Sequence, residues 1–298
     1  MMARVLAALR LFYVLAAAAA LAPRRVLVTG SNKGIGRAIV RRIVEDFPDV
    51  HVLLGSRSPS QGEAAVQKIL EEVPGANVRT LQIDVSDDKS VAAANATVRA
   101  MYDEPNPLYG IVNNAGVGFG RTIPDTLQVN TYGPKRVCES FIPLLDPKVG
   151  RVCNIASASG PNFVRGLSPE QQKLFTSPDT TWEELTAVLE KYSATTDYDG
   201  VAYGLSKASL NVLTMIQAAA HPNLQINSCS PGYILTDLTR GMGATNTPEN
   251  SNCHVAPLFL LFGEPESPPG VAYYYGSDAV RSPLYKYRGP GDPPYLGD

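Results

Sequence analysis

The stretch "RRVLVTGSNKGIG", residues 24–36, decides the fold expected for this chain. A β-branched apolar run that ends in glycine is typical of a buried strand. Gly30, Gly34 and Gly36 follow it with a GxxxGxG spacing, which allows a tight turn and a helix packed closely on the strand. The first N–H groups of that helix would face a pyrophosphate. A glycine-rich turn without a ligand stays open as the alternative.

Strand-like and helix-like segments alternate along the rest of the chain. We expect strands over residues 24–30, 51–57, 78–87, 108–116, 150–160 and 224–232. We expect helices over residues 38–47, 62–73, 90–103, 126–145 and 202–220. This alternation implies right-handed crossovers and therefore an α/β fold with a doubly wound parallel sheet. The sequence after Gly241 is rich in Pro, Gly and Tyr and is expected to be mostly loop.

Composition excludes several classes of function. Of the 298 residues, 44% are apolar and 18% are charged, which is ordinary for a globular protein. A net charge of −2 gives no bulk field that would recruit nucleic acid, so no nucleic-acid partner is expected. No metal site is expected, because the cysteines and histidines have no ligand spacing, and the thiols are expected to be reduced. These residues are Cys138, Cys153, Cys229, Cys253, His51, His221 and His254.

The N-terminal segment, residues 1–24, stands apart from this pattern. Its uninterrupted apolar run from Leu11 to Ala22 is too short to span a bilayer alone. Basic flanks and small residues are typical of a signal or transit peptide. A targeting segment or membrane anchor and a poorly packed leader both stay open, so membrane association stays open too. We expect residues 25–298 to form a single domain.

Five motifs occur in a fixed order: "TGSNKGIG", "NNAG", "NIASASG", "YGLSK" and "SPGYILTD". Together they resemble the short-chain dehydrogenase/reductase family over residues 25–240, and within it the carbonyl reductases. The resemblance implies a Rossmann fold and a cytoplasmic enzyme that reduces aldehydes, ketones or quinones with NADPH. Two alternatives stay open: a steroid- or alcohol-oxidising dehydrogenase, and a non-catalytic NADP-binding regulatory module.

The resemblance assigns four catalytic residues. Tyr203 and Lys207 lie one helical turn apart, so both side chains share a helix face. Tyr203 would transfer the proton, while Lys207 would lower the pKa of the phenol and hold the nicotinamide ribose. Ser157 would bind the substrate carbonyl, with Ser159 as the alternative. Asn130 would anchor a water that links Lys207 to bulk solvent, although its distance from "NNAG" is shorter than in the family, which suggests a shifted helix or a wider substrate cleft.

The same resemblance indicates NADP(H) as the cofactor. Ser56 and Arg57 follow the second expected strand, where NAD enzymes commonly place an acid. Arg57 and Lys33 would meet the 2′-phosphate, although Gln61 stands where many relatives have a further Arg; the alternative is that both are ordinary surface charges. Asp84 would bind the adenine amino group. The other implied cofactor contacts are Gly30, Asn32, Gly34, Ile35, Gly36, Asn113, Asn114, Tyr203, Lys207, Pro231, Gly232, Ile234 and Thr236.

An insertion of about residues 161–195 precedes Tyr203. Capping-box patterns predict two helices in it, starting at Ser168 and Thr181. The second helix has an apolar stripe that should pack on the domain, made of Trp182, Leu185, Val188 and Leu189. A similar insertion in carbonyl reductases covers the face that other members use to dimerise, so a monomer is expected. The insertion, Tyr233 and residues 271–278 are expected to rim the substrate site.

Overall fold

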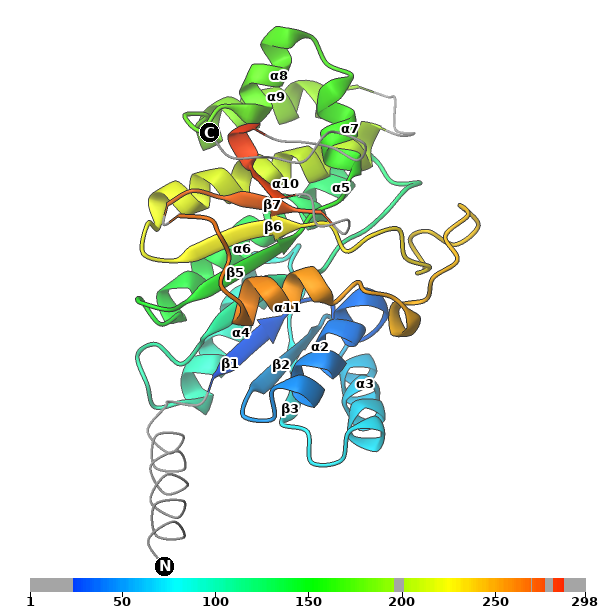
Figure 1. Ribbon diagram of the computed structural model, residues 1–298, viewed down its shortest axis with the longest axis vertical. Helices are drawn as coiled ribbons and strands as arrows, with labels where there is room; N and C mark the ends of the chain where they lie inside the picture. Colours follow the sequence, from blue (N-terminus) through cyan, green and yellow to red (C-terminus); the bar gives the residue numbers. More distant parts are fainter. Residues whose placement is uncertain (1–23, 196–200, 269, 277–280, 287–298) are drawn as a thin grey trace, which may run out of the picture.

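The computed structural model describes residues 24–195, 201–268, 270–276 and 281–286, so the N-terminal leader lies outside it except for Arg24. Its centre is an eight-stranded sheet with the strand order β3-β2-β1-β4-β5-β6-β7-β8 (Figure 1). The strands are β1 (Arg25–Val28), β2 (His51–Ser56), β3 (Val78–Gln82), β4 (Gly110–Asn113), β5 (Arg151–Ile155), β6 (Gln225–Cys229), β7 (Tyr273–Tyr275) and β8 (Arg281–Pro283). Strands β1 to β7 are parallel and β8 is antiparallel, which confirms the doubly wound sheet.

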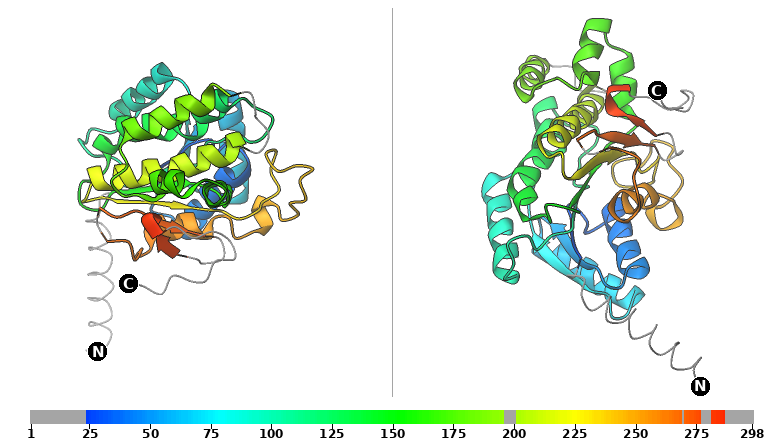
Figure 2. Two further views of the ribbon diagram at one scale, coloured as in Figure 1. Left: turned by 90° about the horizontal axis from the view of Figure 1, so that it is seen from above. Right: turned by 60° about the vertical axis from the view of Figure 1, so that its left-hand side comes forward.

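Helices cover both faces of the sheet (Figures 1 and 2). One face packs against α2 (Gly34–Asp46), α3 (Pro59–Glu72) and α11 (Val255–Phe262). The other packs against α4 (Asp88–Met101), α5 (Ile123–Asn130), α6 (Tyr132–Phe141) and α10 (Val201–Ala220). Beyond α10 lie α7 (Ser159–Arg165), α8 (Pro169–Thr176) and α9 (Trp182–Ser193). Among the described residues, short 3₁₀ turns cover Ile142–Leu144, Pro248–Asn250 and Leu284–Lys286.

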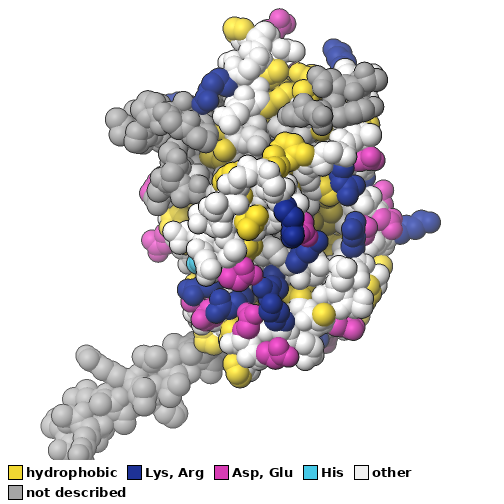
Figure 3. All heavy atoms as spheres, turned by 90° about the vertical axis from the view of Figure 1, so that its right-hand side faces the viewer, with side chains coloured by type: hydrophobic (Ala, Val, Ile, Leu, Met, Phe, Trp, Pro, Cys, Tyr) yellow, Lys and Arg dark blue, Asp and Glu magenta, His cyan; other side chains and the backbone are white. Residues whose placement is uncertain are grey.

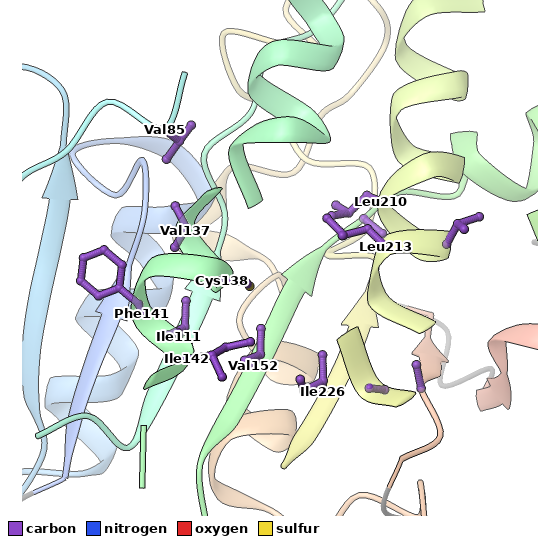
Figure 4. Close-up of a cluster of buried hydrophobic side chains, with 14 of the residues drawn as sticks. Val85, Ile111, Val137, Cys138, Phe141, Ile142, Val152, Leu210, Leu213 and Ile226 are labelled. Atoms are coloured by element: carbon purple, nitrogen blue, oxygen red, sulfur yellow. The ribbon is translucent and has the colours of Figure 1, made fainter. Parts of the chain in front are cut away.

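The strands are apolar on both faces because both faces are buried. In β1, Leu27 joins one hydrophobic cluster while Val26 and Val28 join the other. Figure 4 shows the first cluster, in which Ile111, Val152 and Ile226 project from three neighbouring strands. Strands buried on both sides carry continuous apolar runs, which is why the first strand could be recognised in "RRVLV".

The helix expected over residues 126–145 is wrong in one respect, since the structure breaks it into α5, α6 and a 3₁₀ turn. The break falls between Asn130 and Tyr132. In a continuous helix the Asn130 carbonyl would accept the N–H of residue 134, but that residue is proline and has no N–H. The proline therefore frees the carbonyl oxygen of Asn130 from the helical ladder.

The described part of the chain after Gly241 is mostly loop, as expected, but it also contains a helix and an edge strand that were not predicted. The apolar run 255–262 forms α11, and residues 273–275 add β7 to the edge of β6. Tyr274 and Tyr275 are each only 3% exposed, so they belong to the core and do not rim the substrate site. Three residues are too few to show a strand period, and β7 forms because β6 already offers an edge to pair with.

The insertion contains the two predicted helices. Both α8 and α9 begin with complete capping boxes, at Ser168 and Thr181. The stripe on α9 packs inward as predicted, with Leu185 and Leu189 fully buried. Trp182 meets the ring of Tyr132 edge-on at 5.7 Å, so α9 lies against the start of α6. Helix α7, which was not predicted, precedes them.

Within the described ranges, no helix is both long and apolar enough to cross a membrane. The same residues contain no group of three or more His, Cys, Asp or Glu side chains placed to hold a metal ion. All four cysteines are buried free thiols.

Candidate active site

The candidate residues gather at the carboxyl ends of the parallel strands. The glycine turn follows β1, the "NNAG" turn follows β4, Ser157 follows β5 and Pro231 follows β6. Strands β2 and β3 lie on one side of β1, and β4 and the strands that follow it lie on the other side. The direction of strand order therefore reverses between β1 and β4. A doubly wound sheet has its ligand crevice at such a switch point.

The glycine turn and the "NNAG" turn are in direct contact. Gly30 has φ of 61°, and a Cβ there would lie 2.6 Å from the Cα of Ala115. A Cβ on Gly36 would lie 2.4 Å from Nδ2 of Asn114. That amide donates to the carbonyl oxygens of Thr29 and Gly30 at 2.9 and 3.0 Å. The glycines are therefore required by the close approach of these two turns.

The start of α2 is suited to an anion. Its N-cap residue, Lys33, makes no capping side-chain hydrogen bond, and the first turn of the helix holds no acidic residue. Helices α6, α7 and α11 also begin without a side-chain cap, whereas side chains cap the starts of α3, α4, α5, α8 and α9, namely Ser58, Asp87, Thr122, Ser168 and Thr181. The first N–H groups of α2 are thus left for another partner, and together with the dipole they fit the diphosphate of a dinucleotide.

Arg57 and Asp84 lie near each other beyond the ends of β2 and β3. Burial alone would raise the pKa of Asp84, but hydrogen bonds from the Ser86 hydroxyl and N–H outweigh it, and nearby Arg57 adds to the lowering. Arg57 is exposed. Asp84 is therefore ionised at neutral pH and can accept a hydrogen bond from an amino group.

The structure pairs Lys33 with a residue that the sequence did not connect to it. Its ammonium lies 2.6 Å from the carboxylate of Asp237, which Arg240 also contacts at 2.9 Å. This ion pair links the glycine turn to the loop after β6. On the face seen in Figure 3, basic and acidic side chains lie close together. Lys33 would have to leave or share Asp237 to reach a 2′-phosphate, whereas the described part of the chain offers Arg57 no such ion pair.

Three other expected cofactor residues have local partners. The Asn32 amide donates to Gln61 at 3.1 Å, so the glycine turn is tied to α3. Ile35 packs against Ile234 in a small apolar cluster. Gly34 has φ of 59°, and the nearest atom to a Cβ there would be Cγ2 of Thr236 at 3.7 Å. Gly34 and Thr236 therefore lie close together where the glycine turn meets the loop after β6.

Asn113 lies at the site, but its side chain points away from it. The side chain is buried, and Nδ2 donates to Oδ1 of Asn154 at 2.8 Å. Asn154 in turn donates to Thr214 at 2.9 Å, on α10. The amide nitrogen of Asn113 therefore has a structural role, while its Oδ1 is buried without a hydrogen-bond partner among the described residues.

Tyr203, Ser157 and Ser159 come together where β5 ends. The Tyr203 phenol lies close enough to the Ser157 hydroxyl for a hydrogen bond to lower its pKa. That hydroxyl also lies 3.4 Å from Oγ of Ser159, the first residue of α7. Burial raises the pKa of Tyr203, and the bond to Ser157 offsets part of this rise. Lys207 was expected to lower the pKa of Tyr203, but the protein by itself raises it. The phenol therefore carries its proton at neutral pH.

Lys207 is buried, with 5% of its surface exposed. Its Nζ donates to the Ile155 carbonyl oxygen at 2.8 Å and lies 5.8 Å from the centre of the Tyr203 ring. Burial of the charged form lowers the pKa of Lys207 to about 8, which a small effect of Cys229 opposes. The ammonium is therefore held by β5 at a distance from the phenol, as a cation that titrates close to neutral pH.

Asn130 is fully buried between the "NNAG" turn and α10. Its side chain accepts from the N–H of Val117 at 2.9 Å and donates to the Val117 carbonyl at 3.0 Å. It also donates to the Ser206 hydroxyl at 3.0 Å. A Cβ on Gly116 would lie 3.4 Å from Oδ1 of Asn130 and 3.8 Å from Nζ of Lys207, so both residues flank the same turn. With the side chain engaged, the carbonyl oxygen freed by Pro134 is the group that could hold a water.

A pocket of about 310 Å³ opens beside Tyr203. Its other lining residues are Phe119, Ser159, Asn162, Phe163, Val201 and Gly204. The Phe119 ring lies 5.1 Å from the ring of Tyr203, and its side chain is 44% exposed. A Cβ on Gly204 would lie 2.9 Å from Cβ of Phe163, so this glycine lets α7 approach α10 closely. Sequence reasoning missed Phe119, and the short span between "NNAG" and Asn130 was its only signal.

Tyr233 does not line this pocket. Its side chain is 55% exposed, and its hydroxyl donates to the Met242 carbonyl within the same loop. Gly232 precedes it with φ of 93°, and Pro231 is buried. The loop still reaches the site, because a Cβ on Gly118 would lie 2.4 Å from the Leu238 side chain. The loop therefore closes against the turn that carries Phe119.

This arrangement defines a nucleotide-binding oxidoreductase site, and comparison with known proteins agrees with it. Residues 24–169 match the short chain dehydrogenase family. The human NADPH carbonyl reductase 1 is 34% identical over 266 residues, which cover 82% of this chain and 93% of that protein. The corresponding protein of Oryctolagus cuniculus is 35% identical over 270 residues, which cover 83% of this chain and 95% of the relative. The chain belongs to the short-chain dehydrogenase/reductase family.

Solved structures resemble the fold as well. Salutaridine reductase from Papaver somniferum superimposes with a TM-score of 0.72 at 25% identity, covering 84% of this chain and 99% of that one. The NADPH-bound carbonyl reductase from chicken fatty liver superimposes with a TM-score of 0.60 at 20% identity, covering 87% of this chain and 98% of that one. The second likeness concerns the fold alone.

Proposed function

We propose that this chain is an NADPH-dependent carbonyl reductase that acts on aldehydes, ketones or quinones. The observation that carries the proposal is the grouping of Tyr203, Ser157 and Lys207 beside a pocket, at the same sheet edge as the uncapped start of α2. The similarity to carbonyl reductases named for NADPH supports both the reaction and the cofactor.

The chemistry divides between cofactor and protein. Bound NADPH supplies the hydride that reaches the carbonyl carbon. Ser157 orients the carbonyl oxygen toward Tyr203, whose phenol lies beside the Ser157 hydroxyl. Tyr203 donates its proton to the developing alkoxide, because a phenol with a raised pKa is protonated at neutral pH. Lys207, fixed by Ile155, places a positive charge near the resulting phenolate and stabilises it.

Proton return would run through Lys207 and Asn130. Lys207, with a pKa of about 8, can exchange a proton near neutral pH. The Asn130 carbonyl, released from the helix by Pro134, would hold a water between Lys207 and bulk solvent. The N–H groups at the start of α2 would hold the diphosphate, and the Arg57 guanidinium would hold the 2′-phosphate. Asp84 would accept a hydrogen bond from the adenine amino group.

The chain is also proposed to be a single domain and a monomer, because the insertion occupies a helix face. Helix α9 packs against the α5–α6 region, through Trp182, Tyr132 and Lys135. Light scattering of residues 25–298 should give the mass of one chain, and a stable tetramer would refute the proposal. Family resemblance supports a cytoplasmic location, and fractionation of cells expressing the full chain tests it, since recovery with membranes would assign an anchoring role to residues 11–22.

The proposed reaction is tested by NADPH oxidation with quinones, aromatic aldehydes and steroid ketones. We expect one alcohol formed for each NADPH consumed, with at least one quinone or aromatic aldehyde as substrate. Oxidation of steroid or other secondary alcohols with NADP⁺, without carbonyl reduction, would favour the oxidising dehydrogenase. NADPH binding without turnover of any substrate would favour the regulatory module.

A further inference from the structure

Ser206 lies on α10 between Tyr203 and Lys207, and its side chain is fully buried. Its hydroxyl donates to the Tyr203 carbonyl oxygen at 2.8 Å and accepts from Nδ2 of Asn130 at 3.0 Å. A hydroxyl has one proton, and here that proton is committed to the carbonyl. The Asn130 amide must therefore be the donor of the second bond. One buried oxygen atom thus joins the side chain of Asn130 to the backbone of Tyr203.

A second bond ties the backbone of Ser206 to the same place. The Thr131 hydroxyl donates to the Ser206 carbonyl oxygen at 3.1 Å, and Thr131 is fully buried. Asn130 and Thr131 form the break between α5 and α6. The hydroxyl and the carbonyl oxygen of Ser206 therefore both bond to residues at the break between α5 and α6.

The chain of hydrogen bonds continues to the substrate pocket. Asn130 holds both backbone groups of Val117, at 2.9 and 3.0 Å. Two residues later, Phe119 places its ring 5.1 Å from the ring of Tyr203. The path from the backbone of Tyr203 through Ser206, Asn130 and the turn that carries Phe119 thus returns to the Tyr203 side chain.

We infer that Ser206 is a positioning residue, which sets the Tyr203 phenol and the Lys207 ammonium in register with Asn130 and with the pocket wall. The inference rests on the proposed function. Ser206 touches neither of the two reacting side chains, so it acts through the placement of α10. Small displacements of a catalytic group lower turnover steeply, because reacting atoms must meet at near-contact distance.

Ser209 provides a matched control on the same helix. It is fully buried, and its hydroxyl donates to the Leu205 carbonyl at 2.8 Å, the same kind of backbone bond that Ser206 makes. Ser206→Ala and Ser209→Ala thus each remove one buried hydroxyl, but only the first removes the link to Asn130. We expect Ser206→Ala to lower kcat roughly tenfold, with the KM for NADPH changed less than about twofold, and Ser209→Ala to lower kcat less than about twofold. Equal kcat in the two variants would overturn the inference.

A double-mutant cycle separates positioning from general loss of stability. In an Asn130→Ala background, Ser206→Ala should lower kcat no further, because the bond it removes is already absent. A full additional loss would show that Ser206 acts independently of Asn130 and would overturn the inference. If Ser206→Ala does not fold, Thr131→Val removes the neighbouring tie with little change of shape. Thr131→Val should lower kcat about threefold at unchanged KM for NADPH, and wild-type kcat would contradict the inference.

Failure of the inference and failure of the proposed function give different results. If Tyr203→Phe keeps full reductase activity, the proposed function is wrong, whatever Ser206 does. If Tyr203→Phe is inactive while Ser206→Ala matches Ser209→Ala, only the role of Ser206 is wrong.

Discussion

The glycine turn, residues 29–36, and the substrate rim, which is the turn that carries Phe119, lie at the same edge of the sheet but are built in opposite ways. The turn is braced by hydrogen bonds from Asn114 to its backbone, and a Cβ at Gly30 or Gly36 would overlap neighbouring atoms. The Phe119 side chain on the rim is 44% exposed. One region is fixed by backbone geometry, and the other by loops that place apolar side chains at the surface.

This difference explains why the glycine turn can be recognised in the sequence and the substrate rim cannot. A turn that admits only glycine leaves a sequence pattern, so the class of cofactor can be inferred from spacing. A rim of exposed side chains on loops leaves no such pattern, because many residues can occupy it without strain. Substitutions should therefore act on cofactor binding through the turn, and on substrate choice through the rim.

The largest effect expected from this comparison is that of Gly30→Ala. The new Cβ would lie 2.6 Å from Ala115, at a φ of 61° that alanine rarely adopts. Overpacking and unfavourable φ together cost about 2–5 kcal/mol, and relieving them moves the phosphate-binding turn. We expect NADPH to bind roughly 10²-fold more weakly or worse, as measured by fluorescence titration.

Gly75→Ala is the matched control for backbone strain. Gly75 has φ of 84°, but nothing lies within 4 Å of a Cβ built there. It should lower the free energy of unfolding by about 1–2 kcal/mol and leave NADPH affinity unchanged. If both variants kept wild-type affinity, the glycine turn would not be the phosphate site.

The next effect concerns the choice between NADPH and NADH. Hydrogen bonds to charged groups contribute about 1.5–3 kcal/mol each, and exposure of Arg57 argues for the low end. Lys33 adds less than a free cation would, because Asp237 already holds it. We therefore expect kcat/KM to be at most about 10²-fold higher with NADPH than with NADH.

Arg57→Asp should reverse much of this preference, because a carboxylate repels the 2′-phosphate and accepts a hydrogen bond from the NADH ribose. Comparing kcat/KM for both cofactors, on wild type and variant, measures the change. Arg79→Asp is a control of the same charge change outside the proposed site. Equal use of NADH and NADPH by the wild type would remove Arg57 and Lys33 from the cofactor site.

A smaller effect is the pH dependence of kcat/KM, which we attribute to Lys207. Lys207 is charged below its pKa of about 8 and neutral above it, since burial lowers the pKa from 10.5. If its charge supports both cofactor binding and catalysis, kcat/KM for NADPH should be level below about pH 7. It should then fall toward a tenfold loss for each pH unit above about 8. A profile that stays flat to pH 10 would exclude a role for the Lys207 cation.

The smallest expected effect is that of Phe119→Ala on the rim. An aromatic contact contributes about 0.5–1.5 kcal/mol, so the KM for an aromatic aldehyde should rise about threefold to tenfold. The KM for NADPH and for a small aliphatic aldehyde should stay close to wild type. Val149→Ala, which truncates another exposed apolar side chain, serves as the control. An equal loss for aromatic and aliphatic substrates would mean that Phe119 does not select the substrate.

The parallel sheet and the grouping of the site could be predicted because local patterns carry them. The buried run of β1, the capping boxes at Ser168 and Thr181, and the spacing of Tyr203 and Lys207 each reflect a short-range physical requirement. Strand β7 and helix α11 could not be predicted this way. They form because β6 offers an edge and because an apolar surface needs cover, and neither condition is local.

The site shows the same limit. Asn113 was expected beside the cofactor, yet its amide is committed to Asn154 on the neighbouring strand. Lys33 was expected to meet a phosphate, yet Asp237, 204 positions later, holds it. Such pairings depend on which segments the fold brings together, so spacing along the chain does not reveal them.

The claim that Tyr203 supplies the proton is tested most directly by Tyr203→Phe, which removes the hydroxyl and little else. Tyr109→Phe, which also removes one phenolic hydrogen bond, is the control, because Tyr109 bonds Leu261 away from the site. We expect kcat for carbonyl reduction to fall roughly 10²–10⁴-fold in Tyr203→Phe, with NADPH affinity unchanged, and to stay near wild type in Tyr109→Phe. A Tyr203→Phe enzyme that reduces carbonyls at the wild-type rate would contradict the assigned mechanism.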